Sequence, residues 1–290
     1  MKAYRLAALL LALALLAGCG EAQAPLPLSD RIENLGQVVG ELRSGLRGHA
    51  RRITVTFEYG GDIYDALNGA VERWVEAALC ETEEPAEGDY LRCQLGGYSW
   101  ESAFARQGGV WRYTVTIVPD YYDYLVQEEA VTEAVGALLE RFGFTEETPD
   151  AQKLAVIYDH LCRSVRYDAV HRNKPSAHLK STAYAALIQR TATCQGYCAA
   201  LYRLLRECGI GCRIITGRAG EENHAWVIAE VNGLWYNLDP TWDAGAEEYR
   251  YFLAGSSAFQ EHIPDERFQT RAFRSRYPLA RESYRKEGSK

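Results

Sequence analysis

The stretch from residue 148 to residue 238 places helix-forming sequence first and strand-forming sequence after it, and this order limits the fold more than any other feature of the chain. It opens with a Thr-Pro-Asp run, which is typical of a helix start because proline is favoured at the first helical position. Further helices are predicted near 182–189 and at 194–208. Strands are predicted at about 211–217, 224–231 and 234–238. Helices followed by strands predict an α+β domain.

A second, smaller folding unit is predicted ahead of it, in residues 31–146. Ile53, Val55 and Phe57 alternate with polar residues, which is the period-2 pattern of a half-buried strand. The other predicted elements are helices at 63–79 and 126–142 and strands at 90–94, 98–105 and 110–118. This order suggests helices packed on an antiparallel sheet. Because the unit holds no catalytic set of residues, we interpret it as an accessory α+β domain.

The first eighteen residues have the pattern of an export signal. Lys2 and Arg5 form a basic start, and residues 6–17 are an uncharged apolar run, shorter than the roughly 20 residues that a membrane-spanning helix needs. The run ends in Leu-Ala-Gly-Cys, which resembles the bacterial lipobox; an ordinary signal beside a cysteine is the alternative. We therefore expect a lipoprotein signal peptide at 1–18 and a tether at 19–30. A lipid on Cys19 would hold the exported protein on the extracytoplasmic face of the cell membrane.

The charge of the chain excludes one class of function. Its net charge is −7, and loss of Lys2 and Arg5 with the signal would make it −9. An acidic chain has no electrostatic reason to bind nucleic acid. Residues 267–290, in contrast, hold eight basic and two acidic side chains. The basic tail, taken as residues 263–290, could touch an anionic envelope surface, but a solvated terminus is the simpler interpretation.

Among eight cysteines, Cys194 has a distinctive setting. With Cys19 assigned to the anchor, an odd number remains, which suggests a reactive thiol or intermolecular pairing. Thr193 fits an N-cap, so Cys194 would begin a helix whose N–H groups and dipole favour the thiolate. The same N–H groups could stabilise an oxyanion, and Gly196 would leave the backbone near the sulfur open to a substrate. A buried, inert thiol is the alternative, since most free cysteines are core residues.

Two further residues could complete a catalytic set with Cys194. His224 begins a strand-forming run, where it can lie at a sheet edge and accept the thiol proton. Asp239 follows the next predicted strand, which is reached through an Asn-Gly turn at 232–233. Adjacent antiparallel strands would bring Asp239 beside His224, where the carboxylate could orient the ring and stabilise the imidazolium. Taken singly, each residue also has an ordinary structural interpretation.

The three positions lie in motifs that resemble those of the transglutaminase-like superfamily. These are Thr-Cys-Gln-Gly-Tyr-Cys at 193–198, His-Ala-Trp-Val at 224–227 and Tyr-Asn-Leu-Asp-Pro-Thr-Trp-Asp at 236–243. Shorter matches at 157–159, 166–168, 183–187 and 251–253 extend the resemblance over about residues 147–262. The resemblance implies a papain-like core with Cys194 as nucleophile, His224 as base and acid, and Asp239 as the group that orients His224. Further candidates for the oxyanion site or cleft are Gln195, Gly196, Trp226 and Trp242.

The remaining cysteines and histidines leave alternatives open. We expect Cys198, which departs from the family pattern, to pack in the core rather than form a disulfide. Cys80 and Cys93 flank an acidic loop that a disulfide could close. His171 and His178 are expected to be solvated, although they could line the cleft. A zinc site is disfavoured because it would consume the nucleophile; it would use Cys194, Cys198, Cys208 and Cys212. No motif calls for a cofactor or a metal.

Together these features predict a surface-anchored cysteine acyl-transfer enzyme that acts on amide bonds of proteins or cell-wall peptides. Water as the second substrate would make it a protease or amidase, and an amine would make it a transglutaminase; the same triad serves both. Its expected partners are a protein or peptide substrate in the cell envelope and the membrane that holds the lipid. The alternative is a non-catalytic envelope-binding lipoprotein that keeps the fold.

Overall fold

The computed structural model describes residues 35–59, 64–171 and 175–285. The predicted signal peptide, Cys19 and the tether lie outside these residues. Contacts between Cα atoms divide the chain after Tyr121 into two compact units. Within the described residues, no helix is both long enough and apolar enough to cross a membrane.

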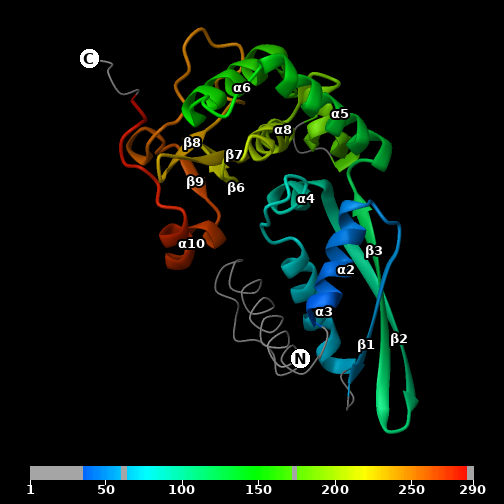
Figure 1. The fold of residues 1–290 in the computed structure, drawn as a ribbon. Helices are drawn as coiled ribbons and strands as arrows, with labels where there is room; N and C mark the ends of the chain where they lie inside the picture. The colour runs from blue at the N-terminus through cyan, green and yellow to red at the C-terminus, as the bar shows by residue number, and fades with distance from the viewer. Residues whose placement is uncertain (1–34, 60–63, 172–174, 286–290) are drawn as a thin grey trace. The chain divides into compact units, whose positions relative to one another are not determined.

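The first unit packs helices on a three-stranded antiparallel sheet with the order β1-β3-β2 (Figure 1). Its strands are β1 (Ile53–Tyr59), β2 (Leu95–Gln107) and β3 (Val110–Tyr121), and its helices are α2 (Leu35–Arg47), α3 (Tyr64–Ala78) and α4 (Asp89–Gln94). Alternate residues of β1 are buried, as its period-2 pattern predicts. They join Leu67, Val71 and Trp74 of α3 in one core. The arrangement confirms a small α+β unit.

One predicted element of this unit is wrong. Residues 90–94 were expected to form a strand, but they lie in helix α4. Tyr90 and Leu91 are both buried although they are neighbours in the chain, which a strand with one solvent-facing side would not allow. The next strand begins directly after this helix, with an irregular register between Leu95 and Gly97.

Most of the helices of the second unit come before its main sheet. They are α5 (Leu125–Phe142), α6 (Asp150–Ser164), the 3₁₀ segment η2 (Pro175–Ser181), α7 (Ala183–Leu187) and α8 (Cys194–Glu207), with a short parallel pair of β4 (Arg166–Tyr167) and β5 (Thr191–Ala192). Helix α5 packs on α7 and α8, and the Arg203 guanidinium of α8 donates to Thr132 Oγ1 of α5 at 3.2 Å. Because of these contacts, α5 belongs to the second unit, and the boundary between the two units follows Tyr121. The sequence suggested a boundary at residue 146.

The main sheet of this unit has four antiparallel strands in the order β8-β7-β6-β9. They are β6 (Cys212–Ala219), β7 (Glu222–Val231), β8 (Leu234–Leu238) and β9 (His262–Pro264). Asn232 and Gly233 connect β7 to β8 with positive φ angles, as a tight Asn-Gly turn requires. The expected α+β class, with helices first and an antiparallel sheet after them, is confirmed.

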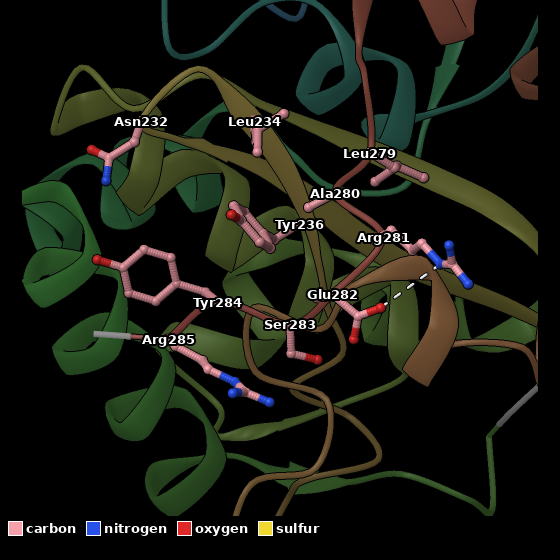
Figure 2. Close-up of a pocket in the computed structure, with 10 residues that line it drawn as sticks. All are labelled: Asn232, Leu234, Tyr236, Leu279, Ala280, Arg281, Glu282, Ser283, Tyr284 and Arg285. Carbon is pink, nitrogen blue, oxygen red and sulfur yellow. Dashed lines mark ion pairs between the residues drawn. The ribbon is translucent and has the colours of Figure 1, made fainter. Parts of the chain in front are cut away.

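The C-terminal region is folded, so the expected solvated tail is wrong for the described residues up to 285. Helices α9 (Glu266–Gln269) and α10 (Arg271–Arg276) bury Phe268 and Tyr277 against the sheet. Arg213 of β6 lies over the Tyr277 ring at 4.8 Å, a cation–π contact that joins the C-terminal region to the sheet. Figure 2 shows residues 279–285 beside β8, where Tyr236 and Tyr284 line a cavity of about 420 Å³.

Candidate active site

Cys194 is the first residue of helix α8, with Thr193 at the N-cap position. Thr193 does not cap the helix with its side chain. Instead its N–H and its hydroxyl both donate to the Lys180 carbonyl, at 2.8 and 3.2 Å. These bonds tie the start of α8 to the end of η2. The Thr193 hydroxyl therefore does not occupy the helix N–H groups, which are the groups that favour a thiolate or an oxyanion.

Gly196 lies in the first turn of α8, which packs closely against the preceding chain. A Cβ atom at this position would lie 2.8 Å from Ala192 Cβ and 2.9 Å from the carbonyl oxygens of Lys180 and Thr182. The glycine therefore permits the first turn of α8 to pack against the preceding chain. Gln195, its neighbour in the same turn, is half-buried.

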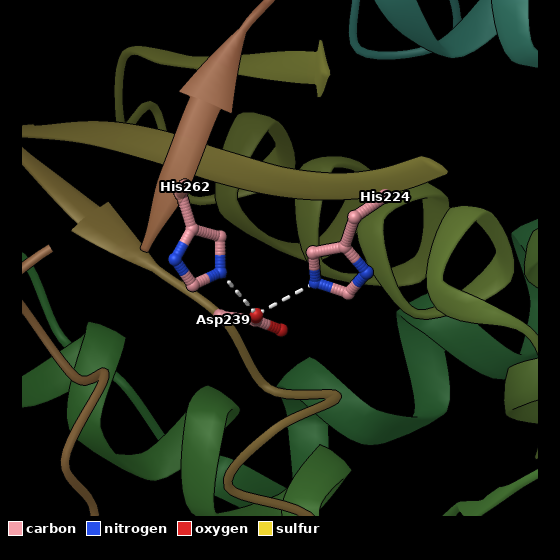
Figure 3. Close-up of side chains that lie close together, drawn as sticks. All are labelled: His224, Asp239 and His262. Atoms are coloured by element: carbon pink, nitrogen blue, oxygen red, sulfur yellow. Dashed lines mark hydrogen bonds and ion pairs between the residues drawn. The ribbon is translucent and has the colours of Figure 1, made fainter. Parts of the chain in front are cut away.

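His224 and Asp239 lie side by side, one in β7 and the other directly after β8 (Figure 3). The His224 Nε2 atom is 2.7 Å from Asp239 Oδ2. Because a carboxylate oxygen accepts hydrogen bonds and does not donate them, Nε2 carries the proton. The other ring nitrogen, Nδ1, is then the one that can serve the Cys194 thiol.

Burial lowers the pKa of His224, but hydrogen bonds to Asp239 and Cys194 outweigh it and raise the pKa to about 9. An imidazolium at neutral pH is the natural counter-ion for a thiolate at Cys194. This pairing is how a cysteine nucleophile is activated.

The Asp239 carboxylate is fully buried and accepts four hydrogen bonds. Its Oδ1 atom accepts the N–H groups of Thr241 and Trp242 at 3.0 and 3.2 Å, and Oδ2 accepts two histidines. Burial alone would raise its pKa, but the bonds from His224 and His262 hold it below the ordinary value. The carboxylate is therefore ionised beside His224.

A second buried pair supports the loop that carries Asp239. Tyr158 of α6 donates to Asp243 Oδ2 at 2.7 Å. The same carboxylate accepts the backbone N–H groups of Arg250 and Tyr251 at 3.0 and 2.9 Å. Since the Asp239 N–H donates to the Tyr251 carbonyl at 3.1 Å, these bonds fix the chain on both sides of Asp239.

The second histidine on Asp239 is His262, which the sequence did not indicate. It lies in β9, and its Nε2 atom is 2.9 Å from the same Oδ2 atom that His224 contacts. The strand has three residues and follows a long connection from β8, so no periodic pattern marks it. Only the tertiary pairing of β9 with β6 brings this residue to the site.

The two tryptophans near the site have different surroundings. Trp226 is 2% exposed and belongs to the core that β6, β7 and the C-terminal helices share. Trp242 is 39% exposed, and its ring centroid lies 5.6 Å from that of His224 and 4.6 Å from that of His262. Trp242 is therefore the partly exposed indole beside His224 and His262, whereas Trp226 lies in the core.

His224, Asp239 and His262 are also close enough together to be considered as metal ligands. Both contacts with Asp239, at 2.7 and 2.9 Å, are ordinary lengths for N–H···O bonds. A metal ion would need these two nitrogens to face it, at about 2.0–2.1 Å each, in place of the carboxylate. The arrangement fits a carboxylate that accepts two N–H donors.

The other cysteines are placed in the structure as follows. Cys198 of α8 is fully buried, as expected for a residue that packs in the core. The suggested Cys80–Cys93 disulfide is not formed. Cys194 and Cys208 lie at opposite ends of α8, about 20 Å apart by the rise of a helix, too far to share a zinc ion.

His171 and His178 have partners of their own. The His171 ring is 2.9 Å from the Asp168 carboxylate, and its side chain is 44% exposed. His178 is exposed and stacks on Tyr122 with ring centroids 4.6 Å apart. Neither contact connects these rings to the triad.

Comparison with known proteins agrees with the motifs. Residues 140–240 match the family profile of the transglutaminase-like superfamily. Kyphoscoliosis peptidase from Homo sapiens is 25% identical over 170 residues, which cover 50% of this chain and 25% of that protein. The Mus musculus protein of the same name is 24% identical over 162 residues, covering 48% of this chain and 24% of that protein.

The chain thus spans about a quarter of the length of these curated relatives. A solved structure of a TGase aligns with a TM-score of 0.39 and 16% identity, covering 56% of this chain and 50% of that one. Residues 140–240 of the second unit are thus similar to the transglutaminase-like superfamily.

Proposed function

We propose that the chain is an exported, lipid-anchored cysteine acyl-transfer enzyme that acts on amide bonds, with Cys194, His224 and Asp239 as its triad. The observation that carries the proposal is the connected set of side chains from buried Asp239 through His224 to Cys194. Each member has the environment that its role needs: a helix start for the nucleophile, a raised pKa for the base, and full burial with four donors for the carboxylate.

In the first half of the reaction, the Cys194 thiolate attacks the amide carbonyl and forms a tetrahedral oxyanion. N–H groups at the start of α8 stabilise that charge. The C–N bond then breaks, and the His224 imidazolium gives its Nδ1 proton to the departing amine. Asp239 stays ionised throughout and holds the Nε2 side of the ring. The product is a thioester between the substrate acyl group and Cys194.

In the second half, neutral His224 accepts a proton from water or from an amine, which attacks the thioester and releases Cys194. Water gives hydrolysis and an amine gives an isopeptide-type cross-link. Trp242, partly exposed beside His224, is placed to contact whichever acceptor enters. Comparing glycine methyl ester incorporation with free-acid release from one glutamine peptide would distinguish the two reactions.

The substrate proposal follows from the proposed location. An enzyme held by a lipid on Cys19 meets proteins and peptides of the cell envelope, so we propose these as its substrates. Incorporation of labelled fatty acid into the wild-type chain and its loss in Cys19→Ala would support the anchor. Equal incorporation of the fatty acid into both chains would contradict the lipid anchor.

The test of the triad is the pH dependence of iodoacetamide labelling at Cys194 in the full chain, read by peptide mass mapping. An activated pair labels rapidly well below the free-thiol pKa of about 8.5, and His224→Ala slows it. His178→Ala is the matched control, because His178 is exposed and stacks on Tyr122, and it leaves the rate unchanged. Labelling only near pH 8.5, or labelling indifferent to His224, would favour the non-catalytic envelope-binding protein.

A further inference from the structure

His262 lies outside the motifs that indicated the proposed triad, and aromatic rings pack around its side chain. It pairs with Ala219 across β9 and β6. Its ring stacks on Phe259 with centroids 3.8 Å apart, and Trp226 and Trp242 lie 5.2 and 4.6 Å away. Aromatic rings on several sides therefore fix its orientation.

The two nitrogens of this ring are used unequally. Nε2 contacts Asp239 Oδ2 at 2.9 Å, whereas Nδ1 is buried and has no hydrogen-bond partner among the residues that the structure describes. Since the carboxylate can only accept, the proton is on Nε2. A phenylalanine could fill the same aromatic surroundings without burying an unpaired nitrogen. The property that only histidine brings here is the N–H group directed at Asp239.

Asp239 needs that donor most when His224 has given up its proton. In the proposed reaction, His224 becomes neutral as the amine departs, and the buried carboxylate loses its cationic neighbour. Oδ1 keeps its two backbone donors, and Oδ2 keeps the second N–H, from His262. A buried carboxylate without sufficient donors takes up a proton instead, and it could then no longer support the imidazolium.

We propose that His262 is a positioning residue for the triad: its Nε2–H group keeps the Asp239 carboxylate ionised and directed at His224. This inference rests on the proposed function. His262 touches Asp239 and not Cys194 or a substrate, so it acts through the carboxylate.

Other groups around Asp239 make such a donor necessary. Asp243 is a second acid in the same loop, and its pKa is raised by burial first and also by the charge of Asp239. Each further neighbour is an acid that would carry negative charge or none. The titratable groups that face Asp239 are His224 of β7, His262 of β9, Asp243 and Tyr251 of the loops after β8, and Tyr158 and Cys162 of α6. The histidines are the only cation-forming side chains in this set.

The experiment compares three variants of the full chain: His262→Gln, His262→Asn and His262→Phe. Glutamine can place an amide N–H near the position of the histidine Nε2 atom, whereas asparagine is one methylene shorter and phenylalanine has no donor. The measurement is the rate of iodoacetamide labelling at Cys194 between pH 4 and pH 9. We expect the acid-side midpoint to rise by about one pH unit in the Phe and Asn variants, the size expected for loss of one bond to a charged group. The Gln variant keeps the wild-type midpoint.

The outcomes separate this inference from the proposed function. If wild-type Cys194 labels only near its ordinary pKa, the proposed function fails. If wild-type labelling is activated but all three variants share its midpoint, only the role of His262 fails. A shift of equal size in the Gln and Asn variants would also overturn it, because a titrating imidazole would then be required. If the Phe variant does not fold by near-UV circular dichroism, the Gln–Asn comparison decides, and if no variant folds, His262 is merely structural.

Discussion

A substitution at Gly196 tests how closely the start of α8 packs against the preceding chain. Alanine there would place a methyl carbon 2.8 Å from Ala192 Cβ and 2.9 Å from two carbonyl oxygens, of Lys180 and Thr182. The Lys180 oxygen accepts both Thr193 bonds, and the Thr182 oxygen accepts the Ala186 N–H at 3.4 Å, so backbone bonds hold both oxygens in place. Relief requires α8 to move, which also moves Cys194.

The magnitude follows from a comparison with a second helical glycine. Gly136 lies in α5 of the same unit, is exposed, and has no atom within 4 Å of the position its Cβ would take. Alanine gains about 1 kcal/mol of helix propensity at either site. Overpacking a tight site costs about 3 kcal/mol, the upper end of the usual range, because backbone atoms are involved. Gly136→Ala is therefore expected to stabilise the chain, and Gly196→Ala to destabilise it by about 2 kcal/mol net.

The assay is urea unfolding followed by near-UV circular dichroism. The midpoints of two variants are compared only if their unfolding free energies depend on urea concentration with the same slope. Iodoacetamide labelling of Cys194 in the same samples reports the helix start. The clash reasoning is refuted if both alanine variants are stabilised equally. It is also refuted if Gly196→Ala loses stability while labelling keeps its wild-type rate, because the helix start would then not have moved.

Three further predictions concern the groups around the site. The raised pKa of His224 contributes stability that is complete below its ordinary value of 6.5 and is lost as pH rises through about 9. Unfolding free energies measured from pH 6 to pH 10 should therefore fall across this range in the wild type and less steeply in His224→Ala; parallel curves would contradict the assignment. Tyr158→Phe removes a buried 2.7 Å bond to Asp243 and should cost about 1–3 kcal/mol in urea unfolding, so an unchanged midpoint would count against it. Gly217→Ala would place its Cβ inside the Ile263 carbonyl, push β9 off β6, and slow Cys194 labelling by withdrawing His262; wild-type labelling in a folded variant would rule this out.

The sequence indicated those parts of the fold whose signals are local. Thr193 and Gly209 bracket a helix, and the structure places α8 between them, at Cys194–Glu207. The strands at β6, β7 and β8 follow from apolar runs separated by turns, and the antiparallel hairpin of β7 and β8 brings Asp239 to His224. The two strands of a hairpin are close together in the sequence, so their residues can be paired from the sequence alone.

What the sequence did not indicate depends on distant contacts. Residues 90–94 form a short apolar segment, and such a segment has no periodicity that separates a strand from a helix. In the C-terminal region, the density of arginine concealed Phe268, Phe273 and Tyr277, whose rings pack in the core or under arginine side chains. The sequence did not indicate His262 either, because its strand β9 pairs with β6, which is distant in the sequence.

The way the C-terminal region meets β8 has a consequence for association between molecules. β8 is an outer strand of its sheet, and residues 278–280 run along it: Trp235 N–H donates to the Pro278 carbonyl at 3.1 Å, and Ala280 N–H donates to the Trp235 carbonyl at 2.8 Å. An uncovered outer strand is a template for pairing with another chain. A protease cut ahead of Pro278 would exchange this internal pairing for an intermolecular one, so self-association would be an early sign of damage to this region.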